Sequence, residues 1–256
     1  MKTATFNINN VNKRLGNLLA WLAEAKPDVV CLQELKSEQA AFPARALLEY
    51  GYNAVWVSER CWNGVAILAR EELVLTRSHL PGDESDRQAR YIEAAVQGVL
   101  IASLYLPNGN PQPGPKFDYK LAWLERLTVH AEALLAAGVP VVLAGDYNVV
   151  PTEQDIYPTR SLDNNALVQP ESRHAFARLL AQGWTDALRH VHPHGPLWTF
   201  WDYKRERWAA DKGMRLDHML LSPGVSRSLG DVGVDRWVRG EENASDHAPV
   251  WARLNL

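Results

Sequence analysis

The chain has 256 residues, of which 46% are hydrophobic and 22% are charged, and its formal net charge is −3. This composition is typical of a folded globular protein, and it argues against a disordered chain and against a protein that coats nucleic acid through bulk positive charge. No apolar run reaches the roughly 18 residues of a membrane span, and the N-terminus MKTATFNINN lacks the apolar core of a signal peptide. We therefore expect a cytoplasmic, monomeric protein with one domain over residues 1–256 and no membrane association.

The first half of the chain contains one helix-to-strand unit followed by strand-like segments. Apolar residues between Asn12 and Lys26 recur with the i, i+3, i+4, i+7 spacing of an amphipathic helix, which Pro27 ends. This helix leads into VVCLQE, a short apolar run that predicts a buried strand ending at Glu34. The segments YNAVWVSE, NGVAILAR, YIEAAVQG and VLIASLYLP are separated by turn residues, so we expect antiparallel strands and hairpins there.

The second half repeats this arrangement. A helical stretch from Lys116 to Ala137 closes at Gly138, and PVVLAGDYN then predicts a buried strand that runs into Asp146. A further helix over about residues 171–182 precedes four strand candidates, WTFWDY, RLDHMLLS, VGVDRWV and PVWARLNL. Two helix-to-strand units, each accompanied by several strands, predict an α+β fold with two packed, mainly antiparallel sheets and outer helices.

Polar residues gather at the ends of the predicted strands. They are Asn7, Asn9, Glu34, Tyr105, Asp146, Asn148, Asp217, Asp246 and His247. Residues two apart on a strand point to the same face, so Asn7 should share a face with Asn9, and Asp146 with Asn148. A buried carboxylate is costly unless it is paired, hydrogen-bonded or bound to a metal, and carboxylate and amide oxygens suit Mg²⁺ or Mn²⁺. The strand ends therefore favour a metal site for phosphoryl chemistry.

Several of these residues also have a purely structural interpretation. Asn9 could satisfy backbone groups near a turn, and Glu34 could form an exposed ion pair with Lys36, which would contribute roughly 0 to 1 kcal/mol. In an extended RLDHML segment, His218 shares a face with the neighbouring leucines and Asp217 points the opposite way. We therefore expect His218 to pack in the core.

Six short motifs occur in order along nearly the whole chain: FNIN, LQE, YLPNG, GDYNVVPT, RLDH and SDHAPVW. Together they resemble the exonuclease III family of exodeoxyribonucleases and abasic-site endonucleases. The resemblance implies a four-layer αββα sandwich. It also implies a DNA repair nuclease, dependent on Mg²⁺ or Mn²⁺, that cleaves 5′ to abasic sites and removes nucleotides or blocking groups from the 3′ ends of duplex DNA.

The resemblance implies a role for each side chain in the motifs. Glu34 resembles the principal Mg²⁺ ligand, and the rest of the implied metal site consists of Asn7, Asp146, Asn148, Asp246 and His247. The implied catalytic residues are Tyr105, Asp146, Asn148, Asp217 and His247. Asp146 would orient or deprotonate the attacking water, and His247, fixed by Asp217, would polarise a phosphate oxygen.

Aromatic and basic residues extend the implied site toward DNA. Phe200 and Trp201 in WTFWDY resemble the aromatic wall of a pocket that accepts a sugar lacking its base, and a core position for one of the two is an equally good interpretation. Arg90, Lys116 and Lys120 lie near the motif segments and could contact phosphates, although a solvated surface position is the simpler interpretation.

Two other functions are compatible with the same motifs. The chain could be a phosphodiesterase or phosphatase that acts on a small phosphate ester, or a catalytically silent relative that binds RNA or protein. A silent relative would be expected to lose its acids, whereas here Glu34, Asp146, Asp217 and Asp246 are all present. The six motifs together are closer to the DNA enzymes than to enzymes of small esters.

Overall fold

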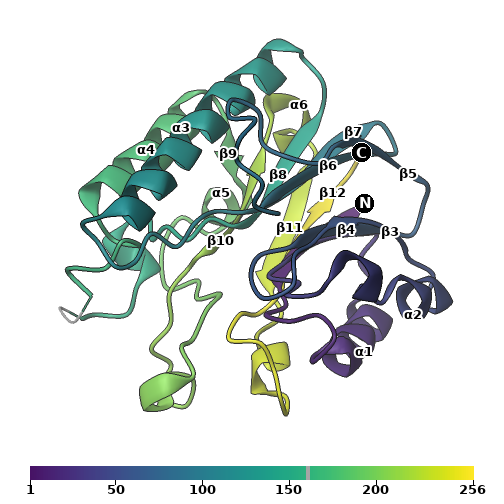
Figure 1. The fold of residues 1–256 in the computed structure, drawn as a ribbon, viewed down its shortest axis with the longest axis horizontal. Coiled ribbons are helices and arrows are strands. Elements are labelled where there is room, and N and C mark those ends of the chain that lie inside the picture. Colours follow the sequence, from purple (N-terminus) through teal and green to yellow (C-terminus); the bar gives the residue numbers. More distant parts are fainter. Residues whose placement is uncertain (160–161) are drawn as a thin grey trace.

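Two sheets form the centre of the molecule, and helices cover their outer faces (Figure 1). The computed structural model describes residues 1–159 and 162–256. The first sheet contains β1 (Lys2–Asn7), β2 (Val29–Gln33), β3 (Asn53–Val57), β4 (Val65–Ala69), β11 (Leu229–Val234) and β12 (Val250–Leu254). The second contains β5 (Leu73–Arg77), β6 (Tyr91–Val96), β7 (Val99–Tyr105), β8 (Val141–Asp146), β9 (Thr185–Asp186) and β10 (Asp217–Leu221).

The two sheets have related topologies. Their strand orders are β11–β12–β1–β2–β4–β3 and β5–β6–β7–β8–β10–β9. Each contains one parallel pair, β1–β2 or β7–β8, while the other neighbouring strands are antiparallel. A parallel pair needs a crossover, which α1 (Leu15–Ala25) supplies in the first sheet and α3 (Pro115–Ala136) in the second. The two helix-to-strand units predicted from the sequence are thereby confirmed.

The helices form two outer layers. The remaining α-helices of the described chain are α2 (Ala44–Glu49), α4 (Pro170–Ala181), α5 (Ala187–Val191) and α6 (Pro223–Ser226). In Figure 1, α1 and α2 lie on one side of the sheets, and α3 and α4 lie together on the other. Among the described residues, no helix combines the length and the apolar content needed to cross a membrane.

The apolar residues of the central strands pack in alternating directions. In β2, Val29 and Cys31 face the second sheet, whereas Val30 and Leu32 pack with Trp21 of α1. Because both faces of such a strand are covered, its sequence reads as a continuous apolar run. One core between the sheets and two further cores beneath the helices confirm the predicted four-layer αββα sandwich.

Some local predictions were wrong. WTFWDY forms no strand, because Phe200 makes only isolated bridges, one to Met214 and one to His247. The edge strand β5 was not predicted, since its residues are largely exposed and carry no alternating pattern of burial. The short helices α2 and α5 were also not predicted, because they have too few turns for an apolar repeat to be recognised.

Candidate active site

The polar strand ends meet at one edge of the two sheets. Asn7 ends β1 in the first sheet, while Tyr105 and Asp146 end the parallel neighbours β7 and β8 in the second. Asp217 begins β10, where it lies directly opposite Asp146 in the antiparallel register. His247 lies just before β12, the antiparallel neighbour of β1. The direction of the strands thus brings residues far apart in sequence to the same place.

Asn7 joins acids from both sheets. Its Nδ2 donates to Oε1 of Glu34 at 2.9 Å and to Oδ2 of Asp146 at 2.9 Å. Oε2 of Glu34 forms an ion pair with Lys36 at 2.6 Å, so the predicted Glu34–Lys36 pair is present, but it belongs to the site rather than to an open surface. Asn7 therefore orients two carboxylates with one amide group.

The turns that follow β1 and β8 share one design. The backbone N–H of Asn9 donates to Oδ1 of Asn7 at 3.1 Å, and that of Asn148 donates to Oδ1 of Asp146 at 2.9 Å. Asn9 and Asn148 both have φ of 47°, the left-handed conformation that asparagine tolerates. Asn7 and Asn9, and likewise Asp146 and Asn148, are therefore brought together by these turns. The prediction that the members of each pair share a face of an extended strand was wrong.

Asn9 does more than satisfy the backbone, contrary to the sequence-based interpretation. Its Nδ2 donates to Oδ1 of Asp246 at 2.9 Å, and its Oδ1 accepts from Nζ of Lys36 at 2.7 Å. Because Lys36 also pairs with Glu34, a continuous network connects Glu34 to Asp246. Asp246 thus lies at the far end of this network.

His247 is held by a buried carboxylate. Its Nδ1 lies 2.8 Å from Oδ2 of Asp217, and the same Oδ2 accepts from Oγ1 of Thr199 at 2.6 Å. Burial alone would lower the pKa of His247, but Asp217, together with Asp146 and Asp246, raises it to about 10. The ring is therefore an imidazolium at neutral pH, with Nε2 as a donor 3.8 Å from Oδ2 of Asp146.

Glu34, Asp146 and His247 form a compact cluster, with one atom of each within 4.8 Å of the others. Burial raises the pKa of Asp146 to about 7, with Asp217 and Glu34 adding to this effect and His247 opposing it. Burial would also raise the pKa of Glu34, but Lys36 and Asn7 lower it below its usual range. Two carboxylates that are kept close together despite burial and mutual repulsion fit a divalent cation. A protonated His247 has no lone pair with which to bind this cation.

Tyr105 and Asn148 complete the wall of the site. Burial raises the pKa of Tyr105 well above its usual value, and the carboxylates of Glu34 and Asp146 raise it further, so its hydroxyl stays protonated. Asn148 donates from Nδ2 to the carbonyl oxygen of Leu106 at 2.9 Å and to Oδ2 of Asp146 at 3.3 Å, while its Oδ1 accepts from Nδ2 of Asn108 at 3.1 Å. Both predicted phosphate contacts therefore offer N–H or O–H groups beside the acids.

A cavity with a mixed lining lies next to His247. It measures about 400 Å³, and its lining combines Phe200, Met214 and Tyr157 with basic side chains between residues 204 and 212. The ring of Phe200 lies 4.9 Å from that of His247. Trp201, the second aromatic predicted for this wall, is fully buried, and its indole N–H donates to Asp211. Of the two aromatics, Trp201 is thus the one with the core position, because adjacent residues of an extended segment point in opposite directions and Phe200 points toward His247.

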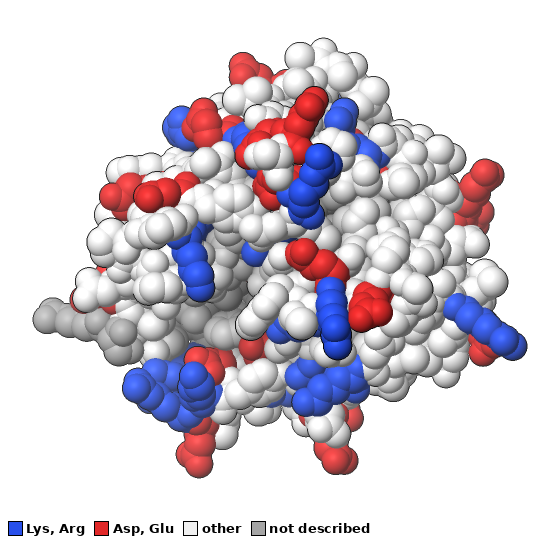
Figure 2. Space-filling model, in the orientation of Figure 1, with Lys and Arg blue, Asp and Glu red and all other residues white. Residues whose placement is uncertain are grey.

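The predicted basic contacts divide into two kinds. Arg90 and the exposed Lys116 line a cavity of about 670 Å³ that also includes Tyr105. Lys120 was expected at the surface but is fully buried, and burial lowers its pKa to about 7 although Asp146 raises it. Figure 2 shows a recess in the surface of the molecule with Lys and Arg side chains along its rim.

His218 is buried as predicted, with Nε2 3.1 Å from the Val149 carbonyl.

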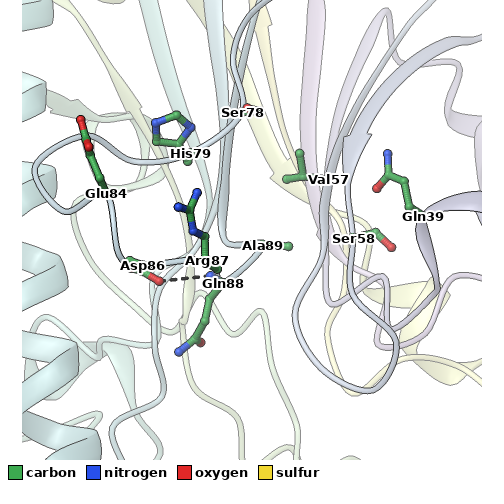
Figure 3. A pocket seen from close by; sticks show the side chains of 10 residues that line it. All are labelled: Gln39, Val57, Ser58, Ser78, His79, Glu84, Asp86, Arg87, Gln88 and Ala89. Atoms are coloured by element: carbon green, nitrogen blue, oxygen red, sulfur yellow. Dashed lines mark hydrogen bonds between the residues drawn. The ribbon is translucent and has the colours of Figure 1, made fainter.

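A separate polar cavity of about 620 Å³ lies between the loop around residues 78–89 and the end of β3 (Figure 3). His79, Glu84 and Arg87 face it from one side, and Gln39 and Ser58 from the other. None of the residues of the acidic cluster lines this cavity. It is therefore distinct from the site described above.

Three residues that shape the site were not predicted from the sequence. Thr199 fixes Asp217 through its hydroxyl, Met214 lines the cavity beside His247, and Asn108 donates to Asn148. Asn108 lies inside the YLPNG motif, so the motif itself could have indicated it. Thr199 and Met214 become recognisable only from the bridges that Phe200 forms with Met214 and His247.

Comparison with known proteins identifies the family to which the whole chain belongs. The pattern of the endonuclease/exonuclease/phosphatase family matches residues 4–247. Exodeoxyribonuclease III of Haemophilus influenzae is 31% identical over 99% of this chain and 100% of its own length. Two solved structures cover 100% of both chains with a TM-score of 0.95: NExo, a 3′ phosphatase from Neisseria bound to a product DNA hairpin (37% identical), and an AP endonuclease from Archaeoglobus fulgidus (33% identical). The chain therefore belongs to the endonuclease/exonuclease/phosphatase family, within its exonuclease III group.

Proposed function

We propose that this protein is a metal-dependent DNA repair nuclease that hydrolyses phosphodiester bonds. One observation carries the proposal: the partly buried carboxylate of Glu34, the buried carboxylate of Asp146 and the charged His247 face the same space at the edge of the sheets. Relatives that match this chain over its full length are named exodeoxyribonuclease III and AP endonuclease, which supports the same chemistry.

Glu34 and Asp146 would hold the divalent cation. Their oxygens are ligands that Mg²⁺ and Mn²⁺ prefer, and Mg²⁺ commonly uses one or two carboxylates together with phosphate oxygens. Asp246 would act from farther away, through Asn9 and Lys36. When bound, the cation supplies positive charge to the phosphate and to the leaving oxygen.

The protein's own groups perform the remaining steps. His247 donates from Nε2 to a phosphate oxygen, and Asp217 keeps the ring protonated and oriented. The hydroxyl of Tyr105 and the amide of Asn148 donate to the same phosphate. Asp146 faces the space in front of Nε2, so it can accept the proton of a water molecule that attacks the phosphorus atom.

The substrate would be duplex DNA with an abasic site or a 3′ end, and the protein would act as a monomer. The cavity beside His247, with Phe200 on its wall, would receive the sugar or terminal nucleotide next to the scissile phosphate. Arg90 and Lys116 would contact phosphates farther along the strand. The full-length similarity to a 3′ phosphatase bound to a DNA hairpin supports a DNA end as one substrate.

A panel of labelled DNA tests the proposal. It contains an abasic duplex, a recessed 3′ end, a 3′-phosphate end and an intact duplex, each with Mg²⁺, Mn²⁺ or EDTA. We expect cleavage of at least one damaged or 3′-ended substrate, lost in EDTA and in Glu34→Gln. If the wild-type protein releases product from none of them but hydrolyses a small phosphate ester, the proposal is wrong.

A further inference from the structure

Lys120 has no part in the mechanism above, yet it lies directly behind the site. It belongs to the buried face of α3, with Phe117 and Leu124 one turn away on either side, and its side chain is 0% exposed. Among the described residues, no carboxylate lies within ion-pairing distance of its Nζ. A buried amine without such a partner is costly, so its hydrogen bonds must compensate.

The partners of Lys120 are two backbone carbonyls at the site. Nζ donates to the carbonyl oxygen of Asn148 at 2.5 Å and to that of Asn108 at 3.2 Å. Asn148 follows β8 and Asn108 follows β7, so one side chain ties together the turns after two neighbouring strands. A lysine amine suits this task because it carries several donors on one atom.

The side chains of these two residues are aligned in series toward the acids. Asn110 Nδ2 donates to Oδ1 of Asn108 at 2.7 Å, Asn108 Nδ2 donates to Oδ1 of Asn148 at 3.1 Å, and Asn148 Nδ2 donates to Oδ2 of Asp146 at 3.3 Å. Each amide is thereby fixed in one of its two orientations. Nδ2 of Asn148 also donates to the carbonyl oxygen of Leu106 at 2.9 Å, so the direction of the Asn148 amide depends on where the backbone that follows β7 and β8 is held.

Gly109 shows how closely this backbone packs on Lys120. It has φ of 88°, and a Cβ atom at this position would lie 2.6 Å from Cδ of Lys120. Both the left-handed conformation and the close approach require glycine. The segment between Asn108 and Asn110 is therefore shaped around the buried lysine side chain.

We propose that Lys120 is a positioning residue, which clamps the backbone of Asn108 and Asn148 and so aims the Asn148 amide at Asp146 and the scissile phosphate. The inference rests on the proposed nuclease function. Because Lys120 is buried, it acts without touching the substrate, and its removal affects turnover rather than DNA binding. Small displacements of catalytic groups are known to cost up to about 100-fold in rate.

Lys120→Met tests this role, since methionine keeps a long side chain but has no donor. We expect turnover to fall by about 10- to 100-fold with KM for DNA within about twofold, measured well below the melting temperature. Lys120→Gln retains one donor group and should recover part of the loss. In an Asn148→Ala background, Lys120→Met should change turnover by less than about twofold, because both changes disturb the same group.

Arg126→Met is the matched control. Arg126 also lies on α3 and donates to the backbone carbonyls of Leu80 and Pro81, but these belong to a loop away from the acidic cluster. It should lower the melting temperature and leave turnover unchanged. A Lys120→Met protein with a lower melting temperature and wild-type turnover would overturn the inference. An equal loss of turnover from Lys120→Met in the wild-type protein and in the Asn148→Ala variant would also overturn it.

The side-chain amide signals of Asn108 and Asn148 in NMR spectra provide a readout that does not depend on activity. We expect slow hydrogen exchange of both NH₂ groups in the wild-type protein and fast exchange in Lys120→Met. Unchanged exchange would overturn the positioning role. If the wild-type protein cleaved no DNA, the nuclease proposal would fail, and the exchange rates would still decide whether Lys120 clamps these residues.

Discussion

Replacing Asp217 by asparagine removes the buried charge beside His247 while it preserves the hydrogen bonds. Oδ2 of Asp217 accepts from Thr199 and from His247, whereas Oδ1 has no hydrogen-bond partner. The amide oxygen of Asp217→Asn can therefore take the place of Oδ2, and its NH₂ group the place of Oδ1. The ring of His247 keeps its position and loses the neighbouring negative charge.

The size of the effect follows from the distance. Opposite unit charges 2.8 Å apart attract by about 6 kcal/mol at an effective dielectric constant of about 20, which is an upper limit. Burial lowers the pKa of His247, but the neighbouring carboxylates, Asp217 above all, outweigh this effect and raise the pKa from 6.5 to about 10. This net rise corresponds to about 5 kcal/mol in favour of the charged ring. Without that charge the ring is mostly neutral above pH 7, and losing one charged donor to the phosphate costs about 10²- to 10³-fold in turnover.

Turnover of Asp217→Asn is measured at saturating substrate and pH 8, on the DNA that the wild-type protein cleaves best. Because Asp217 acts through His247, the double variant Asp217→Asn/His247→Asn should differ in turnover from His247→Asn alone by no more than about twofold. The matched control is Asp235→Asn, whose carboxylate accepts from the indoles of Trp21 and Trp251 outside the site. This control should lose thermal stability alone. An Asp217→Asn protein with near-wild-type turnover would refute the reasoning.

Three further outcomes are expected. Mg²⁺ should raise the melting temperature of the wild-type protein but not that of Glu34→Gln, because binding of the cation needs this carboxylate. Calorimetry with and without EDTA measures the difference, and equal rises in the two proteins would contradict the metal site. Phe200→Ala should lower kcat/KM on DNA by about 10-fold in a gel assay, since it removes the aromatic wall beside His247, and unchanged kinetics would place the substrate elsewhere. Burial would raise the pKa of Asp155, but Arg215 lowers it to about 2 from 3.8, so this group stabilises the fold above about pH 4. Between pH 5 and 2 the wild-type protein should lose about 2 kcal/mol from this pair in urea unfolding, a loss absent from Asp155→Asn; parallel pH profiles would contradict it.

The fold was predictable because its central strands are covered on both faces. Runs such as VVCLQ and VVLAG contain few polar residues, and each follows a stretch with helical periodicity, which is typical of a crossover to a parallel neighbour. The exposed β5 and the bridges of Phe200 depend on contacts between distant segments. Local sequence therefore gave no sign of them.

The acids were predictable for the same physical reason, whereas the position of Lys120 was not predicted. Glu34, Asp146 and Asp217 adjoin apolar runs, where an unpaired carboxylate would be costly, so their position alone indicates a site. Lys120 was assigned to the surface by its charge, although its spacing from Phe117 and Leu124 already put it on the buried face of α3. In that case helical periodicity was a better guide than residue type.

The site also explains why the boundary between the sheets is partly polar. Asn7 in the first sheet donates to Asp146 in the second, and Gln33, the register partner of Asn7 on β2, donates to Ser103 at 3.2 Å across the same boundary. Apolar packing between the sheets sets their spacing but tolerates small shifts of one sheet along the other, because it has no direction. Directional hydrogen bonds fix that register, and they therefore set the separation of Glu34 and Asp146, which come from different sheets. A cation site divided between two sheets needs this constraint, since its ligands must keep their distance when the substrate binds.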